Sequence, residues 1–305
     1  MKMEKYAGYQ YIEGGVCAAQ GFTANGLNCG LNPDKAKNDL GMVYSERLCT
    51  AAAVYTTNKV KGAPVLVTKR HLGMSGGRAK AVIVNSKNAN TCNADGVEIA
   101  EKISELAAQA LEIRPEEVII ASTGVIGQPM SPEPFAAHMQ ELAAGLSREE
   151  HTAAAAVSTE MLQTALSDIV EITYNCLSID GDTSTNDMVS IMANGAAGNP
   201  EITMDGTEYQ SFRQALYIVM ATMTKMLAAD GEGATRLLEC SCVGCPDRQT
   251  AVSIAKSVVQ SSLVKCLLFG CDANWGRIMC AIGYTDADFD IDKVDVDVAS
   301  AAGTI

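Results

Sequence analysis

The chain has 305 residues, and its 23 Lys and Arg against 36 Asp and Glu give a formal net charge of −13. This acidic balance excludes a protein whose main task is to neutralise phosphate backbones, so we expect no nucleic-acid partner. Hydrophobic residues make up 48% and charged residues 19% of the chain, which excludes a disordered or fibrous protein and supplies a sizeable core.

The first residues carry charges, but no apolar run follows them, and no stretch has the length of a membrane span. We therefore expect a soluble cytoplasmic protein without a membrane partner. The eleven cysteines are scattered through apolar segments, for example at Cys49, Cys176, Cys266 and Cys280. In such a chain they are predicted to be reduced, mostly buried thiols.

Strand and helix patterns alternate along the first half of the chain. They predict a strand over 79–85, a helix over 99–110, a strand over 118–121 and a helix over 131–145. The first helix is expected to end before Pro115, because the residue before a proline disfavours helical geometry. Ser131 followed by Pro132 is typical of a helix start.

The second half is predicted to hold three helices and one buried strand, besides a half-buried strand over 238–243. In order, they are a helix capped by Ser158, a helix over 212–227, a helix opened by Asp247 and a buried strand over 263–269. In the first of these, Leu162, Leu166, Ile169 and Val170 are expected to face inward. The alternation of strands and helices makes the fold class α/β.

Four loops are unusually polar or rich in glycine, namely 85–91, 122–127, 180–187 and 230–235. Loops held by rigid elements often carry sites. In the second loop, Gly124 lets backbone N–H groups converge on a ligand oxygen, as an oxyanion hole requires, although a glycine turn after a strand is also common without any site.

The other three loops leave two readings open. The Asn-rich loop 85–91 fits a site and an ordinary turn about equally. Loop 180–187 opens like a calcium loop, but it lacks the required Gly and Glu, so a satisfied hydrogen-bond network is favoured. In the fourth loop, Glu232 between two glycines is free to meet a cation such as a substrate amine, although a solvated helix end explains it almost as well.

Cys240, Cys242 and Cys245 form the one cysteine cluster. Cys242 and Cys245 have the spacing of metal ligands, but a closed zinc site needs four ligands, and no second pair of this kind exists. Alternation over 238–243 instead predicts a half-buried strand in which Cys240 and Cys242 share the face of Leu238. We therefore predict no metal site.

The histidines complete no catalytic arrangement with a serine or cysteine. His71, His138 and His151 lie in segments that are predicted to be solvated loops or helix faces. The glycine spacings of dinucleotide-binding and P-loop motifs are also absent, so we expect no nucleotide cofactor, and no cofactor of another kind is indicated.

Seven motifs remain in sequence order, at 21–24, 56–58 with 63–65, 84–90, 121–127, 180–187, 230–235 and 274–277. Together they resemble the ornithine acetyltransferase family of arginine biosynthesis, and the resemblance covers nearly the whole chain. It implies a layered fold of two α/β regions, in which 1–150 match the family's α chain and 151–305 a shortened β chain. It also implies an oligomer, because the family assembles from both chains.

The resemblance implies acetyl transfer from N-acetylornithine to glutamate, and some family members also use acetyl-CoA. The family works through an acetyl-enzyme on a threonine, which becomes an N-terminus when the precursor cleaves itself within a Pro-Asn-Met-Ala-Thr-Met-Leu segment. A terminal threonine suits this role because its own amine can act as the base. By resemblance, Thr123 and Gly124 match the oxyanion-hole pair, and Glu232 matches a substrate-binding glutamate.

The chain departs from the family at two places. Between about 151 and 157, several tens of family residues are missing, including the self-cleavage site with its nucleophilic threonine. A C-terminal family segment with further substrate-binding residues is also missing beyond Ile305. We therefore expect a glutamate N-acetyltransferase family member that is inactive as it stands. The alternative is a non-catalytic, internally deleted paralogue that keeps the scaffold and binds amino acids weakly.

Overall fold

The computed structural model describes residues 5–147, 156–300 and 303–304. The chain forms two compact units, unit 1 from Met1–Asp168 with Thr183–Leu216, and unit 2 from Ile169–Asp182 with Tyr217–Ile305. These units follow packing, so the division into α-chain and β-chain regions at residue 150 stays a prediction. The junction expected between about 151 and 157 lies largely outside the described residues.

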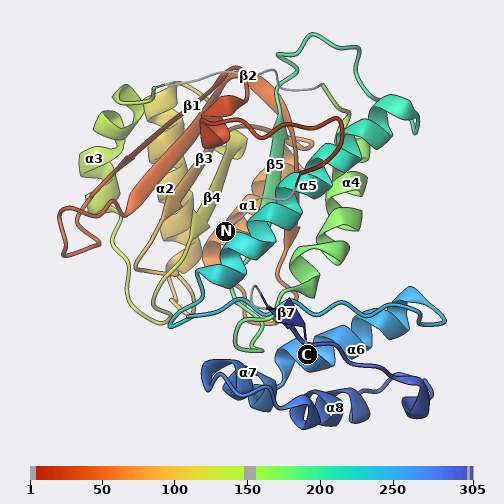
Figure 1. The fold of residues 1–305 in the computed structure, drawn as a ribbon. Helices are drawn as coiled ribbons and strands as arrows, with labels where there is room; N and C mark the ends of the chain where they lie inside the picture. The colour runs from red at the N-terminus through yellow and green to blue at the C-terminus, as the bar shows by residue number, and fades with distance from the viewer. Residues whose placement is uncertain (1–4, 148–155, 301–302, 305) are drawn as a thin grey trace. The chain divides into compact units, whose positions relative to one another are not determined.

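Unit 1 contains a five-stranded mixed sheet (Figure 1). Its strands are β1 (Phe22–Leu27), β2 (Leu40–Tyr55), β3 (Arg78–Asn85), β4 (Val118–Ser122) and β5 (Met188–Ala193). The order is β1-β2-β3-β4, and β5 pairs with the second half of β2. Strands β3 and β4 are parallel, whereas the other pairs are antiparallel. The carboxyl ends of β3 and β4 therefore lie at the same edge of the sheet.

The two strands predicted in this region are confirmed. In β3, the alternate residues Ala79, Ala81 and Ile83 are buried, as expected for a strand with one apolar face. In β4, Val118 and Ile119 point to opposite faces and both are fully buried. A strand buried on both faces is typical of parallel pairing inside an α/β unit.

Three helices pack on this sheet, namely α1 (Ala63–Met74), α2 (Gly96–Leu111) and α3 (Glu133–Ala144), and two short 3₁₀ turns, η1 (Gly15–Ala18) and η2 (Pro115–Glu117), flank the strands. The helices share one apolar core with β2, β3 and β4, in which Phe135 and Ile103 are almost fully buried. The predicted helices over 99–110 and 131–145 are confirmed. Helix α3 begins one residue later than the motif predicts, with Pro132 instead of Ser131 at the cap position, although Ser131 Oγ does accept the N–H of Glu133 at 3.1 Å.

Two further helices, α4 (Thr159–Ile172) and α5 (Thr207–Ala229), begin in unit 1 and end in unit 2, and a 3₁₀ turn, η3 (Tyr174–Cys176), follows α4. The predicted cap of α4 is confirmed, because Ser158 Oγ accepts the N–H of Met161 at 3.4 Å. The inward-facing residues expected in α4, such as Leu162, are buried. The helix predicted over 212–227 is confirmed within α5.

The expectation that His71 is solvated was wrong. Its side chain is buried in α1, with Nδ1 at 3.0 Å from the carbonyl oxygen of Val118 and Nε2 at 3.1 Å from Glu101. Burial lowers the pKa of the imidazole. His71 thus links α1 to β4 and α2. His138 is half-buried and its Nδ1 lies 2.8 Å from the carbonyl oxygen of Pro134, while His151 lies outside the described residues.

Unit 2 is built around α6 (Arg248–Gln260), α7 (Ser262–Phe269) and α8 (Trp275–Gly283), followed by the 3₁₀ turn η4 (Ile291–Lys293) and the short antiparallel pair β6 (Ala299–Ser300) and β7 (Gly303–Thr304). The three helices enclose an apolar core. Ser257 Oγ donates to the carbonyl oxygen of Ala281 at 2.6 Å and joins α6 to α8. No single helix in the described residues is long and apolar enough to cross a membrane, although α6 and α7 together pass a test of length and composition.

Two predictions in unit 2 were wrong. Residues 263–269 form α7 instead of a strand, because Ser261 caps a helix there by accepting the N–H of Val264 at 3.3 Å. A short apolar run does not distinguish a buried strand from a helix. Residues 238–243 form no strand, yet Leu238, Cys240 and Cys242 do pack on the same core.

The expectation that the cysteines are mostly buried was also wrong. All eleven are free, but only Cys29 and Cys49 are buried, and the exposed ones include Cys266 and Cys280. Cys266 and Cys280 lie in the helices α7 and α8, in which some side chains face the core of unit 2 and others face the solvent.

Candidate active site

Two of the polar loops meet at one edge of the sheet in unit 1, because they follow the parallel strands β3 and β4. Residues 85–91 leave β3 and residues 122–127 leave β4. Asn88 forms an isolated parallel bridge to Val125 beyond the strands, and the N–H of Gly127 donates to the carbonyl oxygen of Thr91 at 2.9 Å. The two loops therefore run side by side and support each other.

The asparagines of the first loop hold this arrangement together. Asn85 is almost fully buried, its Nδ2 donates to the carbonyl oxygen of Asn88 at 2.9 Å, and its Oδ1 accepts the hydroxyl of Ser122 at 2.6 Å. Asn88 Nδ2 donates to the carbonyl oxygens of Gln128 and Pro129. These amides satisfy buried backbone groups that water does not reach. The many asparagines of loop 85–91 thus form a hydrogen-bond network that fixes the backbone of the two loops after β3 and β4.

Asn186 brings the third polar loop to the same edge. Its Nδ2 donates to the carbonyl oxygens of Ala89 at 2.7 Å and Ser122 at 3.0 Å, one on each of the two neighbouring loops. Its Oδ1 accepts the hydroxyls of Thr91 and Thr185, both at 2.6 Å. One side chain therefore joins three loops. The sequence had favoured a satisfied network for residues 180–187, and the part in unit 1 agrees with that interpretation.

Thr123 and Gly124 lie at the surface of this network. The N–H of Thr123 is used, because it donates to the carbonyl oxygen of Asn85 at 3.0 Å. The hydroxyl of Thr123 and the N–H of Gly124 have no hydrogen-bond partner among the described residues, and both residues are exposed. Two adjacent free donors on a rigid support can hold an oxygen that carries negative charge.

Only glycine fits at position 124. Its φ of +133° lies where side chains are strained, and a Cβ atom there would collide with the backbone of Lys87 and Asn88. The close approach of the two loops therefore depends on the missing side chain, as the glycine in this loop had suggested.

Glu232 lies in unit 2, in the turn after α5. It is exposed and is one of the residues that line a pocket of about 300 Å³. Gly233 has a φ of +72°, so the chain turns directly after the carboxylate through a conformation that favours glycine. Thr123 and Gly124 belong to unit 1, whereas Glu232 belongs to unit 2.

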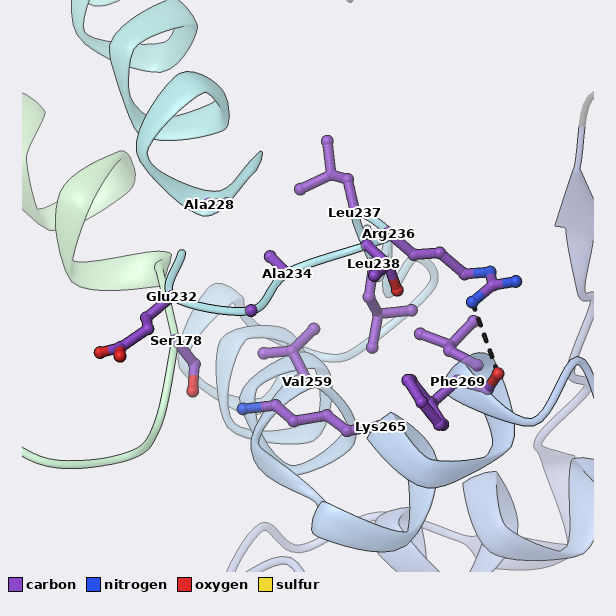
Figure 2. A pocket seen from close by; sticks show the side chains of 13 residues that line it. Ser178, Ala228, Glu232, Ala234, Arg236, Leu237, Leu238, Val259, Lys265 and Phe269 are labelled. Atoms are coloured by element: carbon purple, nitrogen blue, oxygen red, sulfur yellow. Dashed lines mark hydrogen bonds between the residues drawn. The ribbon is translucent and has the colours of Figure 1, made fainter. Parts of the chain in front are cut away.

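The pocket in unit 2 carries both signs of charge (Figure 2). Lys265 Nζ donates to the carbonyl oxygen of Ile179 at 2.6 Å, and Arg236 Nη1 donates to the carbonyl oxygen of Phe269 at 3.4 Å. The Lys265 side chain reaches toward Ser178, whose buried Oγ has no hydrogen-bond partner among the residues that the structure describes. The Glu232 carboxylate points away from Lys265 in the same view.

Sequence reasoning missed the cations of this pocket and the joining role of Asn186. Lys265 comes from a segment with no motif, so only the fold brings it to this pocket, whereas Arg236 directly follows the motif at 230–235 without belonging to it. Asn186 carried a signal, since it stands in a dense polar loop, but its partners are distant in sequence. Among the described residues, no group of three or more His, Cys, Asp or Glu side chains is placed to hold a metal ion.

The sequence as a whole identifies the family. A model of the ArgJ family matches residues 23–159 and 151–304. The chain belongs to this family. It is therefore one of the acetyltransferases of arginine biosynthesis, which act on small-molecule substrates.

Individual relatives agree. The chain is 36% identical to the arginine biosynthesis bifunctional protein ArgJ of Caldanaerobacter subterraneus over 348 positions, covering 97% of this chain and 85% of that protein. It is 39% identical to its counterpart in Staphylococcus epidermidis, covering 93% and 83%. Among solved structures, the ornithine acetyltransferase of Mycobacterium tuberculosis, complexed with ornithine, matches with 27% identity and a TM-score of 0.42, covering 61% of this chain and 94% of that one.

Proposed function

We propose that this chain carries the oxyanion-binding half of a glutamate N-acetyltransferase site and lacks the nucleophile that turnover requires. The observation that carries the proposal is the pair of free donors, the Thr123 hydroxyl and the Gly124 N–H, on a loop fixed by the asparagine network. Such donors stabilise the tetrahedral intermediate of acyl transfer, and each contributes roughly 3–4 kcal/mol. They cannot replace the attacking group.

Two observations support the proposal that a family segment is missing from this chain. The alignment with the Caldanaerobacter protein runs over 348 positions, which exceeds the 305 residues of this chain, so it contains gaps opposite this chain. The family model also matches in two pieces that meet at residues 151–159. This is the place where the sequence departs from the family and where the self-cleavage motif belongs.

The structure on either side of the junction is firmly held. Ser147 pairs with Ala24 through two hydrogen bonds of 3.2 Å. After the junction, the N–H of Ala156 donates to Asn199 Oδ1 at 2.9 Å, and Val157 pairs with Ile202. A segment inserted between these anchors would therefore leave unit 1 attached on both sides.

The experiment restores the missing segment. The purified chain is expected to transfer acetyl from N-acetylornithine to glutamate at background rate, because no acetyl-enzyme can form. A variant that carries the corresponding Staphylococcus epidermidis segment between residues 150 and 156, together with the C-terminal family segment after Ile305, is expected to regain ping-pong transfer. Robust turnover by the unmodified chain would overturn the proposal of inactivity.

The role of Thr123 is tested in the restored variant. Thr123→Val removes the hydroxyl but keeps the volume, and is expected to lower kcat by about 10²–10³, the usual cost of one oxyanion donor. Thr123→Ser keeps the hydroxyl and is the matched control. Equal kcat values for the two variants would remove Thr123 from the site.

A second candidate function is weak amino-acid binding without catalysis. The pocket beside Glu232 favours it, because one carboxylate with two cations complements the ammonium and carboxylate groups of an amino acid such as ornithine. Calorimetry should detect weak ornithine binding that Glu232→Gln removes while the melting temperature stays nearly unchanged. A large loss of stability would instead make Glu232 a structural residue. The cytoplasmic location and an oligomeric state also remain proposals, based on the sequence and the family.

A further inference from the structure

The cysteine cluster of unit 2 contains a pair of thiols in direct contact. Cys242 Sγ lies 3.3 Å from Cys245 Sγ, with either sulfur able to donate the hydrogen bond. Cys240 packs against the same apolar core but forms no hydrogen bond within the described residues. The geometry therefore selects one pair out of the three cysteines.

The surrounding chain keeps this pair in place. Both sulfurs lie against the core of α6, α7 and α8, and Gly244 turns the chain between them with a φ of +75°. Pro246 restricts the backbone directly after Cys245. Asp247 then fixes the start of α6, where its Oδ1 accepts the N–H of Thr250 at 2.8 Å. The two thiols thus meet in a turn that is held at its C-terminal side.

We propose that Cys242 and Cys245 are a redox-active dithiol, which closes to an intramolecular disulfide by exchange with a small-molecule disulfide. The sulfur atoms of a disulfide are about 2.0 Å apart, so the pair needs to approach by only slightly more than 1 Å. A disulfide between Cys242 and Cys245 closes only a short ring of the chain, so the effective concentration of one thiol at the other is high. A metal site is the weaker assignment, since no third ligand joins the pair in the part of the chain that the structure describes.

The exchange takes place in two balanced steps. Burial raises the pKa of the Cys242 thiol, and the hydrogen bond with Cys245 adds to this effect, so Cys242 is the poorer nucleophile. Cys245 therefore attacks the small disulfide first, gives up its proton and releases one small thiol. Cys242 then loses its proton and attacks the Cys245 sulfur of the mixed disulfide, which releases the second small thiol. The two protein thiols are oxidised and the small disulfide is reduced.

The experiment uses the full chain and oxidised glutathione as the probe. After incubation, free thiols are blocked with an alkylating agent and the chain is digested with trypsin. Cleavage after Arg236 and Arg248 places all three cysteines in one peptide, whose fragment ions locate the bond. We expect this peptide to lose two alkylation sites, with the bond between Cys242 and Cys245, and to regain both sites after treatment with dithiothreitol.

Three variants test the order of attack. Cys242→Ser should accumulate a mixed disulfide with glutathione at Cys245, because no second thiol resolves it, whereas Cys245→Ser should accumulate far less at Cys242. Cys240→Ser is the matched control and should behave like the unmodified chain. A bond that involves Cys240, a pair that stays fully alkylated under oxidising conditions, or stoichiometric zinc that Cys242→Ser abolishes would each overturn the proposal. The first measurement needs no variant, so a variant that fails to fold leaves the proposal testable.

Discussion

At the scale of single residues, the candidate site in unit 1 depends on residues that position its loops. Gly124 lets two loops touch, and Asn186 joins three loops through four hydrogen bonds, two donated to backbone carbonyl oxygens and two accepted from threonine hydroxyls. The Thr123 hydroxyl and the Gly124 N–H have no hydrogen-bond partner among the described residues and can meet a ligand. The sequence could indicate the free donors through the family motif, whereas the supporting contacts join residues far apart in the chain.

Gly124→Ala should destabilise the fold more than Gly127→Ala. Both glycines have positive φ values, +133° and +74°, but a Cβ atom at Gly127 meets nothing within 4 Å, whereas at Gly124 it collides with backbone. Gly127→Ala is therefore expected to cost about 1 kcal/mol of unfolding free energy from conformational strain alone. Urea unfolding, monitored by circular dichroism, measures the free energy of unfolding of both variants. Equal losses would contradict the close approach of the loops.

Asp39 provides a pH-dependent contribution to stability. Burial by itself would raise the pKa of this carboxyl group, but the backbone N–H groups of Asn32 and Cys29, at 2.5 Å and 2.7 Å, outweigh burial and lower it. Because the unfolded pKa is about 3.9, the contribution is complete above that pH and is lost as the pH falls through the lower folded pKa.

Asp39→Asn should therefore cost about 1–3 kcal/mol at neutral pH, since the two N–H groups lose a charged acceptor. The difference from the unmodified chain should shrink as the pH falls below about 4. Urea unfolding at several pH values measures it. Asp34→Asn, at an exposed carboxylate of the same loop, is the control and should change little. A difference that is independent of pH would contradict the assigned charge state of Asp39.

At the scale of elements, the sequence predicted those whose apolar period and end signals agree. Helix α2 repeats its apolar face over four turns, and the N–H groups at the starts of α4 and α6 bond to the side chains of Ser158 and Asp247. Prediction failed for α7, where eight mostly apolar residues show no clear period. It failed again at 238–243, where the alternation is real but no second strand lies alongside to pair with it.

The cap of α7 gives a direct test of that correction. Ser261→Ala removes the oxygen that accepts the N–H of Val264 and should cost about 1 kcal/mol. Ser262→Ala, at an exposed position one residue further on, is the matched control. Trp275, the one tryptophan in the sequence, lies in α8, so its fluorescence during urea unfolding reports on unit 2. Equal unfolding midpoints for the two variants would contradict the cap.

At the scale of the whole molecule, the family motifs are divided between the two units. The donors at Thr123 and Gly124 belong to unit 1, and Glu232 belongs to unit 2. The motifs identified the family because they recur in order along the sequence, which requires no knowledge of packing. The assignment of α4 and α5 to both units follows from packing alone, so no sequence signal marked it.

Self-cleavage has a candidate position in this chain, because part of the family's cleavage motif occurs away from its place in the family. Met220-Ala221-Thr222-Met223 repeats four residues of the family's self-cleavage motif. These residues lie inside α5, however, where Thr222 Oγ1 donates to the carbonyl oxygen of Ile218 at 2.7 Å, one turn earlier. That hydroxyl is thus hydrogen-bonded backwards along the helix. Cleavage at this position would also require the helix to open.

The unmodified chain should therefore remain one polypeptide on a denaturing gel after prolonged incubation. The variant with the restored segment between residues 150 and 156 is the positive control and should yield two bands, one of which begins with the inserted threonine. N-terminal sequencing separates the outcomes. A new N-terminus at Thr222 in the unmodified chain would show that α5 opens and that the chain supplies its own nucleophile, and the proposal of inactivity would then fail with it.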